Sequence, residues 1–508
     1  MSSPRMSRLC RALGVLAVVW LTVAPAGVGR ADPAEAERIR GAIEDALGSV
    51  QWPWKAGGAI TVTEIGGAYH VVVPNVTLDS GAGIGGRHDG SFELGDVSII
   101  AKPLADDRYH VDLTLANRMT FREPGGDVAM LVTIGKQRFE GIFIPAFQTL
   151  VEANAAYEDI WLTGPDLQPM MTLSELTMRV DMAEIAPGSW SGPSVYKVSQ
   201  LRFDVPESGE RFDLGALEVR GYIDALRLAD WSQFIREMTG MIEQLRQQTD
   251  TAEPDPAAVL ALLGDMPNLF SGMWMDMTIS DVSVRDAGGA RVFGMDRMVM
   301  HFGVDGVDQD RAGARFRYEH SGLDVAALEG VTRQTVPGDV TLEIEAIDLP
   351  TQALWQGIIE VIESSAELPP EVIQMMLLQR VTEAALAAST GLNVTKLNVD
   401  APGIGITGAG GIKADGASMY GVTGQFDVTV RGMDSMIAAM MDAPEDETAM
   451  EIAGALSLMQ ALGAPETDQD GVSVRRYLLT IGADGQMLLN GNDLQAMLGP
   501  MMGQPAAP

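Results

Sequence analysis

The chain has 508 residues, of which 46 % are hydrophobic and 20 % are charged, with 35 basic and 69 acidic side chains. This hydrophobic share excludes wholesale disorder, and the length predicts two to four domains of about 150 residues each. The net charge of −34 argues against nucleic-acid binding, because that affinity comes from lysine and arginine side chains that neutralise phosphates.

Residues 1–31 have the pattern of a signal peptide. Arg5, Arg8 and Arg11 precede an apolar stretch from Ala12 to Val23, and the small residues Gly29 and Ala31 occupy the −3 and −1 positions of a cut before Asp32. An apolar stretch of about 12 residues is shorter than the roughly 20 that a membrane span needs. We therefore expect cleavage after Ala31 rather than a membrane anchor.

The predicted cleavage changes the composition of the mature chain. It removes four arginines, no acidic residue and Cys10, which is the only cysteine. The mature protein would then be still more acidic and cysteine-free, with no thiol for a disulfide, a zinc site or a nucleophile. Together with the excess of arginine over lysine, the signal indicates a protein of the bacterial periplasm.

Alternation of apolar and polar residues predicts strands along most of the mature chain. Tyr109, Val111, Leu113 and Leu115 alternate with polar neighbours, which is typical of a sheet with one face in water. We expect a mainly β (α+β) protein with large, curved antiparallel sheets and packed amphipathic helices. Further strands of this kind are expected at 275–284, where the apolar phase slips at Asp281 and predicts a bulge, and at 342–346 and 420–430.

Three amphipathic helices are expected, each directly after a strand. The first begins with Asp230 as its cap and extends to residue 245, and the others cover 349–362 and 433–441. Because one strand–helix unit cannot bury its apolar side alone, the recurrence indicates an internal repeat. The run Val372–Thr390 contains several charged and polar residues, so we expect a packed helix there and no transmembrane segment in the mature chain.

A polar, acidic, proline-bearing stretch at 249–256 is typical of a linker. It would separate an N-terminal β-rich half, residues 32–248, from a C-terminal β-rich half, residues 257–500, and residues 501–508 would form a flexible tail. Asp-Pro-Ala followed by a helical run occurs near the start of both halves, at residues 32–34 and 255–257. Two related halves and coincidence in an alanine-rich chain are both open.

The C-terminal third has a distinctive order of elements. A glycine-rich run is followed by a strand, two helical stretches, an acidic turn and a closing strand with a glycine-bounded end: 403–408, 420–430, 431–437, 447–462, 466–471 and 482–491. This layout resembles the closing module of alphaproteobacterial exported proteins grouped as domain of unknown function 2125. More distantly, it is similar to envelope proteins of the AsmA type. The first family implies no activity or site residues, and the second is associated with lipid handling.

Sequence motifs for chemistry are weak throughout. Gly403, Gly405 and Gly408 match G-x-G-x-x-G, but a strand follows where a dinucleotide site needs a helix. The five histidines are scattered without a metal-binding or triad spacing. We expect no catalytic residue, no cofactor and no metal site, so the protein is interpreted as a non-enzyme. Acidic loops at 305–310 and 466–471 leave open either weak calcium binding or solvated carboxylates.

Methionine clusters at 266–300, 433–459 and 487–502. Its unbranched, polarizable side chain fills irregular cores, and it also suits apolar grooves that accept varied ligands. Both interpretations are open. In the second, a hydrophobic-ligand groove would be lined by Met238, Met241, Met433, Met436 and Met440.

Two functions follow from these patterns. The first is a non-enzymatic periplasmic protein that binds or carries a lipid or other hydrophobic ligand in a groove between a sheet and the methionine-rich helices. The alternative is a structural or protein-interaction module of the cell envelope, with other envelope proteins as partners and no small-molecule site.

Overall fold

The computed structural model describes residues 33–498 except 48–53, 80–89, 124, 206–207, 248–263, 265, 327, 329, 365–368, 442–446 and 469–470. The predicted signal peptide (1–31), linker (249–256) and tail (501–508) lie outside the described residues. The expected mainly β fold is confirmed, with 57 % strand and 23 % helix and with antiparallel pairing.

The chain groups into two compact units. Unit 1 contains Met1–Ser208 and Glu218–Ala258, and unit 2 contains Gly209–Leu217 and Val259–Pro508. The long strand β12 (Arg211–Arg227) therefore contributes residues to both units.

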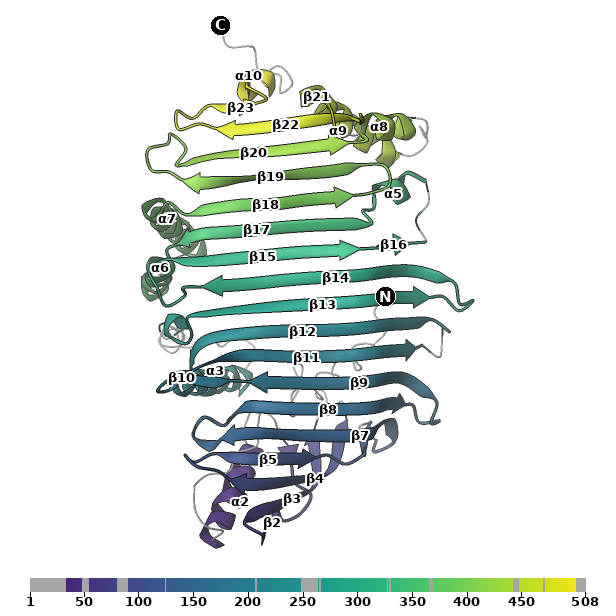
Figure 1. Ribbon diagram of the computed structural model, residues 1–508, viewed down its shortest axis with the longest axis vertical. Helices are drawn as coiled ribbons and strands as arrows, with labels where there is room; N and C mark the ends of the chain where they lie inside the picture. The colour runs from purple at the N-terminus through teal and green to yellow at the C-terminus, as the bar shows by residue number, and fades with distance from the viewer. Residues whose placement is uncertain are drawn as a thin grey trace. The chain divides into compact units, whose positions relative to one another are not determined.

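Unit 1 is an antiparallel sheet in which strands mostly pair with the next strand along the chain (Figure 1). Besides its part of β12, its elements are α2 (Pro33–Leu47), β1 (Trp54–Lys55), β2 (Thr61–Ile65), β3 (Ala68–Asp79), β4 (Ser91–Pro103), β5 (Tyr109–Thr114), β6 (Arg118–Arg122), β7 (Val128–Ile144), β8 (Thr149–Thr163), β9 (Pro169–Asp181), β10 (Ala183–Ala186), β11 (Ser189–Asp204) and α3 (Leu228–Gln247).

The core of unit 1 lies on one face of this sheet. Tyr109, Val111 and Leu113 are buried while the residues between them are not, which confirms the alternation expected for β5. Ile39 and Ile43 of α2 are buried in the same cluster. Because paired strands place their apolar residues on the same face, one helix and many strands share a single core.

A carboxylate is buried where α2 meets β5. Glu35 is fully buried, accepts a hydrogen bond from the Tyr109 hydroxyl and pairs with the guanidinium of Arg38. Burial and the neighbouring Glu35 carboxylate raise the pKa of the Tyr109 phenol. Such a buried carboxylate is tolerated because both a donor and a cation compensate its lost hydration.

We expect unit 1 to lose stability in alkali, and Tyr109→Phe to reduce that loss. The folded pKa of Tyr109 lies above the unfolded value of about 10, so the unfolded chain releases the proton first. This contribution to the free energy of unfolding is complete below about pH 10 and is lost as pH rises towards the folded pKa. Urea unfolding at pH 8 and pH 11 measures it, and equal losses in wild type and variant would contradict the assignment.

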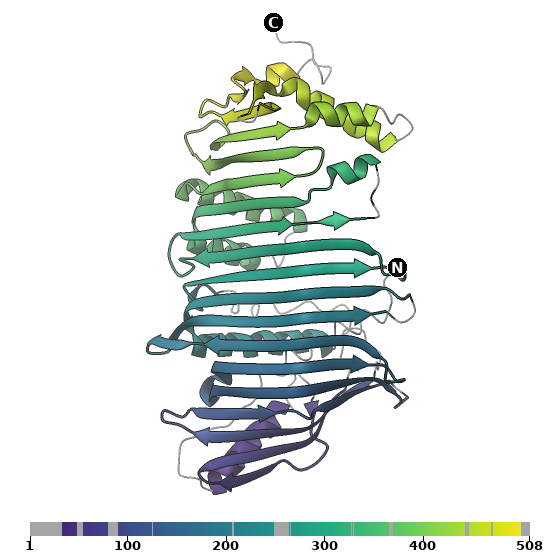
Figure 2. The same cartoon turned by 45° about the vertical axis from the view of Figure 1, so that its right-hand side comes forward.

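Unit 2 is also an antiparallel meander (Figures 1 and 2). Besides its part of β12, its elements are β13 (Gly272–Arg285), β14 (Arg291–Asp305), β15 (Ala312–Ser321), β16 (Asp324–Val325), α5 (Gly330–Thr335), β17 (Asp339–Leu349), α6 (Thr351–Ser364), α7 (Pro370–Ala388), β18 (Gly391–Asp400), β19 (Gly405–Ala414), β20 (Val422–Arg431), α8 (Met433–Met441), α9 (Glu447–Leu462), β21 (Ala464–Thr467), β22 (Ser473–Ile481), β23 (Met487–Leu489), β24 (Asn492–Asp493) and α10 (Leu494–Leu498).

The three expected strand–helix pairs are confirmed as β12–α3, β17–α6 and β20–α8. The predicted start of the first helix was wrong: α3 begins at Leu228, so Asp230 lies in its first turn instead of capping it. The run at 372–390 is indeed a helix, α7. Within the described residues, none of the helices combines the length and apolar character that a membrane crossing requires.

The phase slip expected at Asp281 is present, but it is not a one-strand bulge. Asp281 has a φ of 55°, in the left-handed region, and strand pairing passes from Ser280–Arg297 to Val282–Met295 without a change of register. One residue of each strand, Asp281 and Asp296, is therefore left out of the pairing. Gly215 is required opposite this point, since a Cβ there would lie 2.6 Å from the Cβ of Asp281.

Candidate functional site

The sheet of unit 2 has two chemically different faces. Residues paired directly across antiparallel strands point to the same face, so the pairing defines rows that run across the sheet. Two such rows cross eight strands, β13, β14, β15, β17, β18, β19, β20 and β22, and define what we call the apolar face. They are Met275, Phe302, Phe316, Ile344, Val394, Gly410, Phe426 and Leu479, and Met277, Met300, Tyr318, Leu342, Leu397, Gly408, Val428 and Tyr477.

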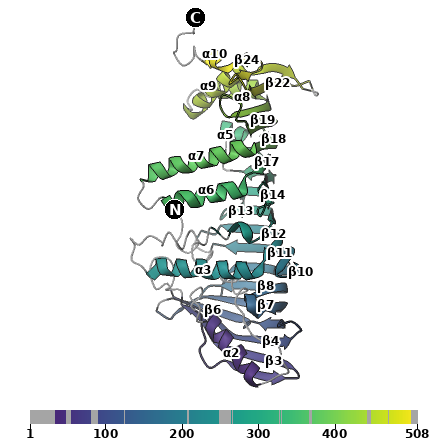
Figure 3. The same ribbon diagram turned by 90° about the vertical axis from the view of Figure 1, so that its left-hand side faces the viewer.

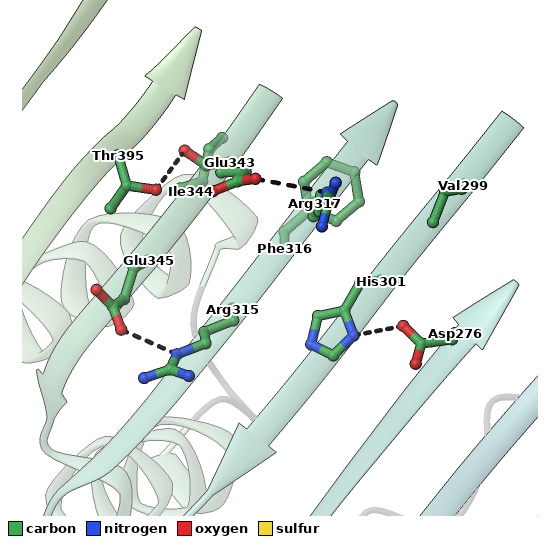
Figure 4. A pocket seen from close by; sticks show the side chains of 10 residues that line it. All are labelled: Asp276, Val299, His301, Arg315, Phe316, Arg317, Glu343, Ile344, Glu345 and Thr395. Carbon is green, nitrogen blue, oxygen red and sulfur yellow. Dashed lines mark hydrogen bonds and ion pairs between the residues drawn. The ribbon is translucent and has the colours of Figure 1, made fainter. Parts of the chain in front are cut away.

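The opposite side, which we call the polar face, carries charged residues in ion pairs. His301 Nδ1 lies 2.6 Å from Asp276 Oδ1, and Arg315 Nε donates to Glu345 Oε1 at 2.9 Å. Figure 4 shows these side chains around a hollow of about 410 Å³. The charged side chains that line this hollow are thus already paired with one another.

The apolar face is partly open, because most residues of its two rows are only half-buried. Met275 and Phe302 are each 42 % exposed, and Leu392, on the same face of β18, is 45 % exposed. Figure 3 shows α6 and α7 on one side of the unit 2 strands, extending away from them rather than lying flat across the sheet. In unit 1, the corresponding strand residues are buried in one large cluster. Within the described residues, the apolar face of unit 2 thus resembles a core whose second layer is incomplete.

Two polar side chains on the apolar face, Tyr318 and His320 near the end of β15, satisfy each other. His320 Nε2 lies 3.2 Å from the carbonyl oxygen of Pro337, which can only accept, so this nitrogen carries the proton. In the neutral ring, Nδ1 is then an acceptor for the Tyr318 hydroxyl at 3.0 Å. This pairing keeps both polar groups compatible with an apolar surface.

The five methionines predicted to line a groove fall into two groups. Met433, Met436 and Met440 of α8 are buried, where they pack with Val430 and with Ala453 of α9. Met238 and Met241 of α3 are partly buried in unit 1. The α8 side chains thus form a local core that includes Val428 and Tyr477 of the apolar face, and the groove assigned to these five residues stays a prediction.

The sequence pattern of the open apolar face was visible but was not recognised as a site. The alternating Met275, Met277 and Ile279 predicted a strand, and the structure places them beside Met298, Met300 and Phe302. The glycine motif lies in this sheet too: β19 begins at Gly405, and a Cβ on Gly408 would lie 3.0 Å from the Asp427 carbonyl oxygen. Close strand packing therefore explains Gly408, and a strand follows the motif, as expected.

One group of possible metal ligands was missed. His110, Asp112 and Glu140 of unit 1 offer ligand atoms that all lie within 4.8 Å of one another. Part of this group could have been found in the sequence, because the alternation over 109–115 places the polar residues His110 and Asp112 on the same face of the strand. The third ligand comes from β7, which only the strand pairing brings opposite Asp112.

No family model, curated protein or solved structure matches the chain. The resemblance to domain of unknown function 2125 and to AsmA-type proteins therefore stays a prediction, and the residues of the site themselves carry the functional argument.

Proposed function

We propose that this protein is a non-enzymatic periplasmic carrier that binds a lipid or another hydrophobic ligand on the apolar face of unit 2. The observation that supports this is the pair of uncharged rows across eight strands, together with the exposure of Met275, Phe302 and Leu392. Large exposed apolar patches on proteins are usually binding surfaces, because leaving them in water costs about 25 cal/mol per Å².

The chemistry of the face favours hydrocarbon over a protein partner. Protein interfaces carry about one hydrogen bond per 100–200 Å², whereas the polar atoms of Tyr318 and His320 already bond to their neighbours. Five methionines, Met273, Met275, Met277, Met298 and Met300, provide the adaptable surface that fits chains of different shape.

The charge of the chain limits which lipids would bind. With a net charge of −34, the protein repels anionic head groups, so a neutral or zwitterionic lipid is the expected ligand. Contact with a lipid would run through the apolar face and not through a basic surface.

Native mass spectrometry tests the proposal. Mature protein purified from its own periplasm should carry hydrophobic adducts, which detergent exchange removes and added zwitterionic phospholipid restores. A clean apoprotein that takes up no lipid would count against the proposal.

One observation favours the interaction-module alternative. On α7, Met375 is 63 % exposed and Leu378 is 67 % exposed, and their spacing of three places them on one side of the helix. A stripe of this kind suits a partner protein. In-cell crosslinking from Leu378 should then yield one reproducible partner, and a lipid-loaded protein without such a partner would favour the carrier function.

A further inference from the structure

His110, Asp112 and Glu140 lie together on the side of the unit 1 strands that faces away from the core. His110 and Asp112 lie two residues apart on β5 and so point to the same face, and Glu140 on β7 is paired directly with Asp112. Three side chains from two adjacent strands therefore converge from one side of the sheet. We propose that this triad is a binding site for a divalent transition metal of the zinc class.

The distances fit a shared metal better than a direct bond. His110 Nδ1 lies 3.7 Å from Asp112 Oδ2, which is too long for a hydrogen bond. Two ligands that each lie about 2.1 Å from a tetrahedral zinc are about 3.4 Å apart. Small side-chain rotations therefore bring these two atoms to coordination distance.

The His301–Asp276 pair of unit 2 provides an internal comparison. There the two side chains are 2.6 Å apart and hydrogen-bonded. That pair is already satisfied by its own hydrogen bond, whereas His110 and Asp112 are too far apart to bond to each other. The same two residue types thus occur in one arrangement suited to a metal and one that is not.

Two hydrogen bonds orient the Glu140 carboxylate. Arg138 and Asn154 both donate to its Oε1, at 2.7 and 3.3 Å. Oε2 remains as the ligand atom. Hydrogen bonds that orient a ligating carboxylate in this way typically strengthen metal sites.

The chemistry of the donor set indicates the metal class. Imidazole nitrogen suits zinc and its neighbours, whereas calcium and magnesium prefer sites made of oxygen alone. Three protein ligands leave a fourth position of a tetrahedral zinc for water or for a group on a bound molecule.

Isothermal titration calorimetry with Zn²⁺ on the mature full-length chain tests this inference. We expect a site of unit stoichiometry that His110→Ala and Asp112→Asn each weaken at least tenfold, while the matched control His301→Ala leaves it unchanged. Nitrogen-15 histidine spectra should show the His110 ring shifting on titration.

Other results would overturn the site. The absence of saturable zinc binding would contradict it. Zinc binding that both triad variants leave intact would also contradict it, because the ions would then associate only loosely with the acidic surface. A calcium titration that gives equal affinity would contradict the assigned metal class. The triad side chains are partly exposed, so the two variants are expected to fold, and circular dichroism checks this.

Discussion

Phe302→Gln is expected to weaken binding of a neutral apolar probe, N-phenyl-1-naphthylamine, by roughly tenfold. Phe302 lies on the apolar face of β14 and is 42 % exposed without ligand, so a ligand can bury what remains of its ring. Burying a whole phenylalanine side chain stabilises by about 1.5–3 kcal/mol, so burying the remaining 42 % contributes about 0.6–1.3 kcal/mol. The cost of desolvating the glutamine amide adds to this loss and brings the change in affinity to roughly tenfold. Fluorescence titration of the delipidated protein measures the change.

The matched control for this experiment is Val299→Gln. Val299 belongs to the same strand but lines the hollow on the polar face, so the same polar side chain is introduced there without touching the apolar face. The control should bind the probe as wild type does. Equal weakening in both variants would mean that binding depends on the general stability of unit 2, and no weakening in Phe302→Gln would rule out the apolar face.

Phe143→Ala is expected to lower the free energy of unfolding of unit 1 by about 3–5 kcal/mol. The side chain is 1 % exposed and lies in the large core of unit 1. Truncating a buried phenylalanine loses its transfer free energy and leaves a cavity that rigid strands cannot fill. Urea unfolding followed by hydrogen exchange and mass spectrometry reports on unit 1 and unit 2 separately.

Ile100→Ala provides the comparison for unit 1. Ile100 is exposed on the other face of β4, so its truncation leaves no cavity and should cost less than about 1 kcal/mol.

Added lipid is expected to act differently on the two units. It should raise the stability of unit 2 by mass action and leave unit 1 unchanged. Stabilisation of unit 1 alone would contradict binding on the apolar face of unit 2.

Local patterns predicted the elements because they depend on neighbours in the chain. The alternation from Tyr109 to Leu115 correctly predicted both a strand and its buried side, and the helical spacing after Arg431 predicted α8. The slip at Asp281 was also visible in the sequence, because the alternating apolar residues are at odd-numbered positions up to Ile279 and at even-numbered positions from Val282. The predicted helix start at Asp230 was wrong by two residues, because α3 begins at Leu228, directly after β12.

The role of the methionines could not be predicted in the same way. Met436 of α8 and Met300 of β14 are chemically identical, yet the first is buried against α9 and the second lies on a face that is partly open. Burial depends on which distant elements cover a residue. A residue pattern of period 3.6 or period 2 marks a side as apolar but does not say what covers it.

The sequence by itself determined the acidic, mainly β character of this protein, the position of several strands and the helices that follow three of them. Only the tertiary structure decided how apolar residues from eight strands join into one face, and that Glu140 lies opposite Asp112. The physical reason is that strand pairing is non-local: register is set by the whole sheet, whereas each strand's own sequence specifies only its two sides.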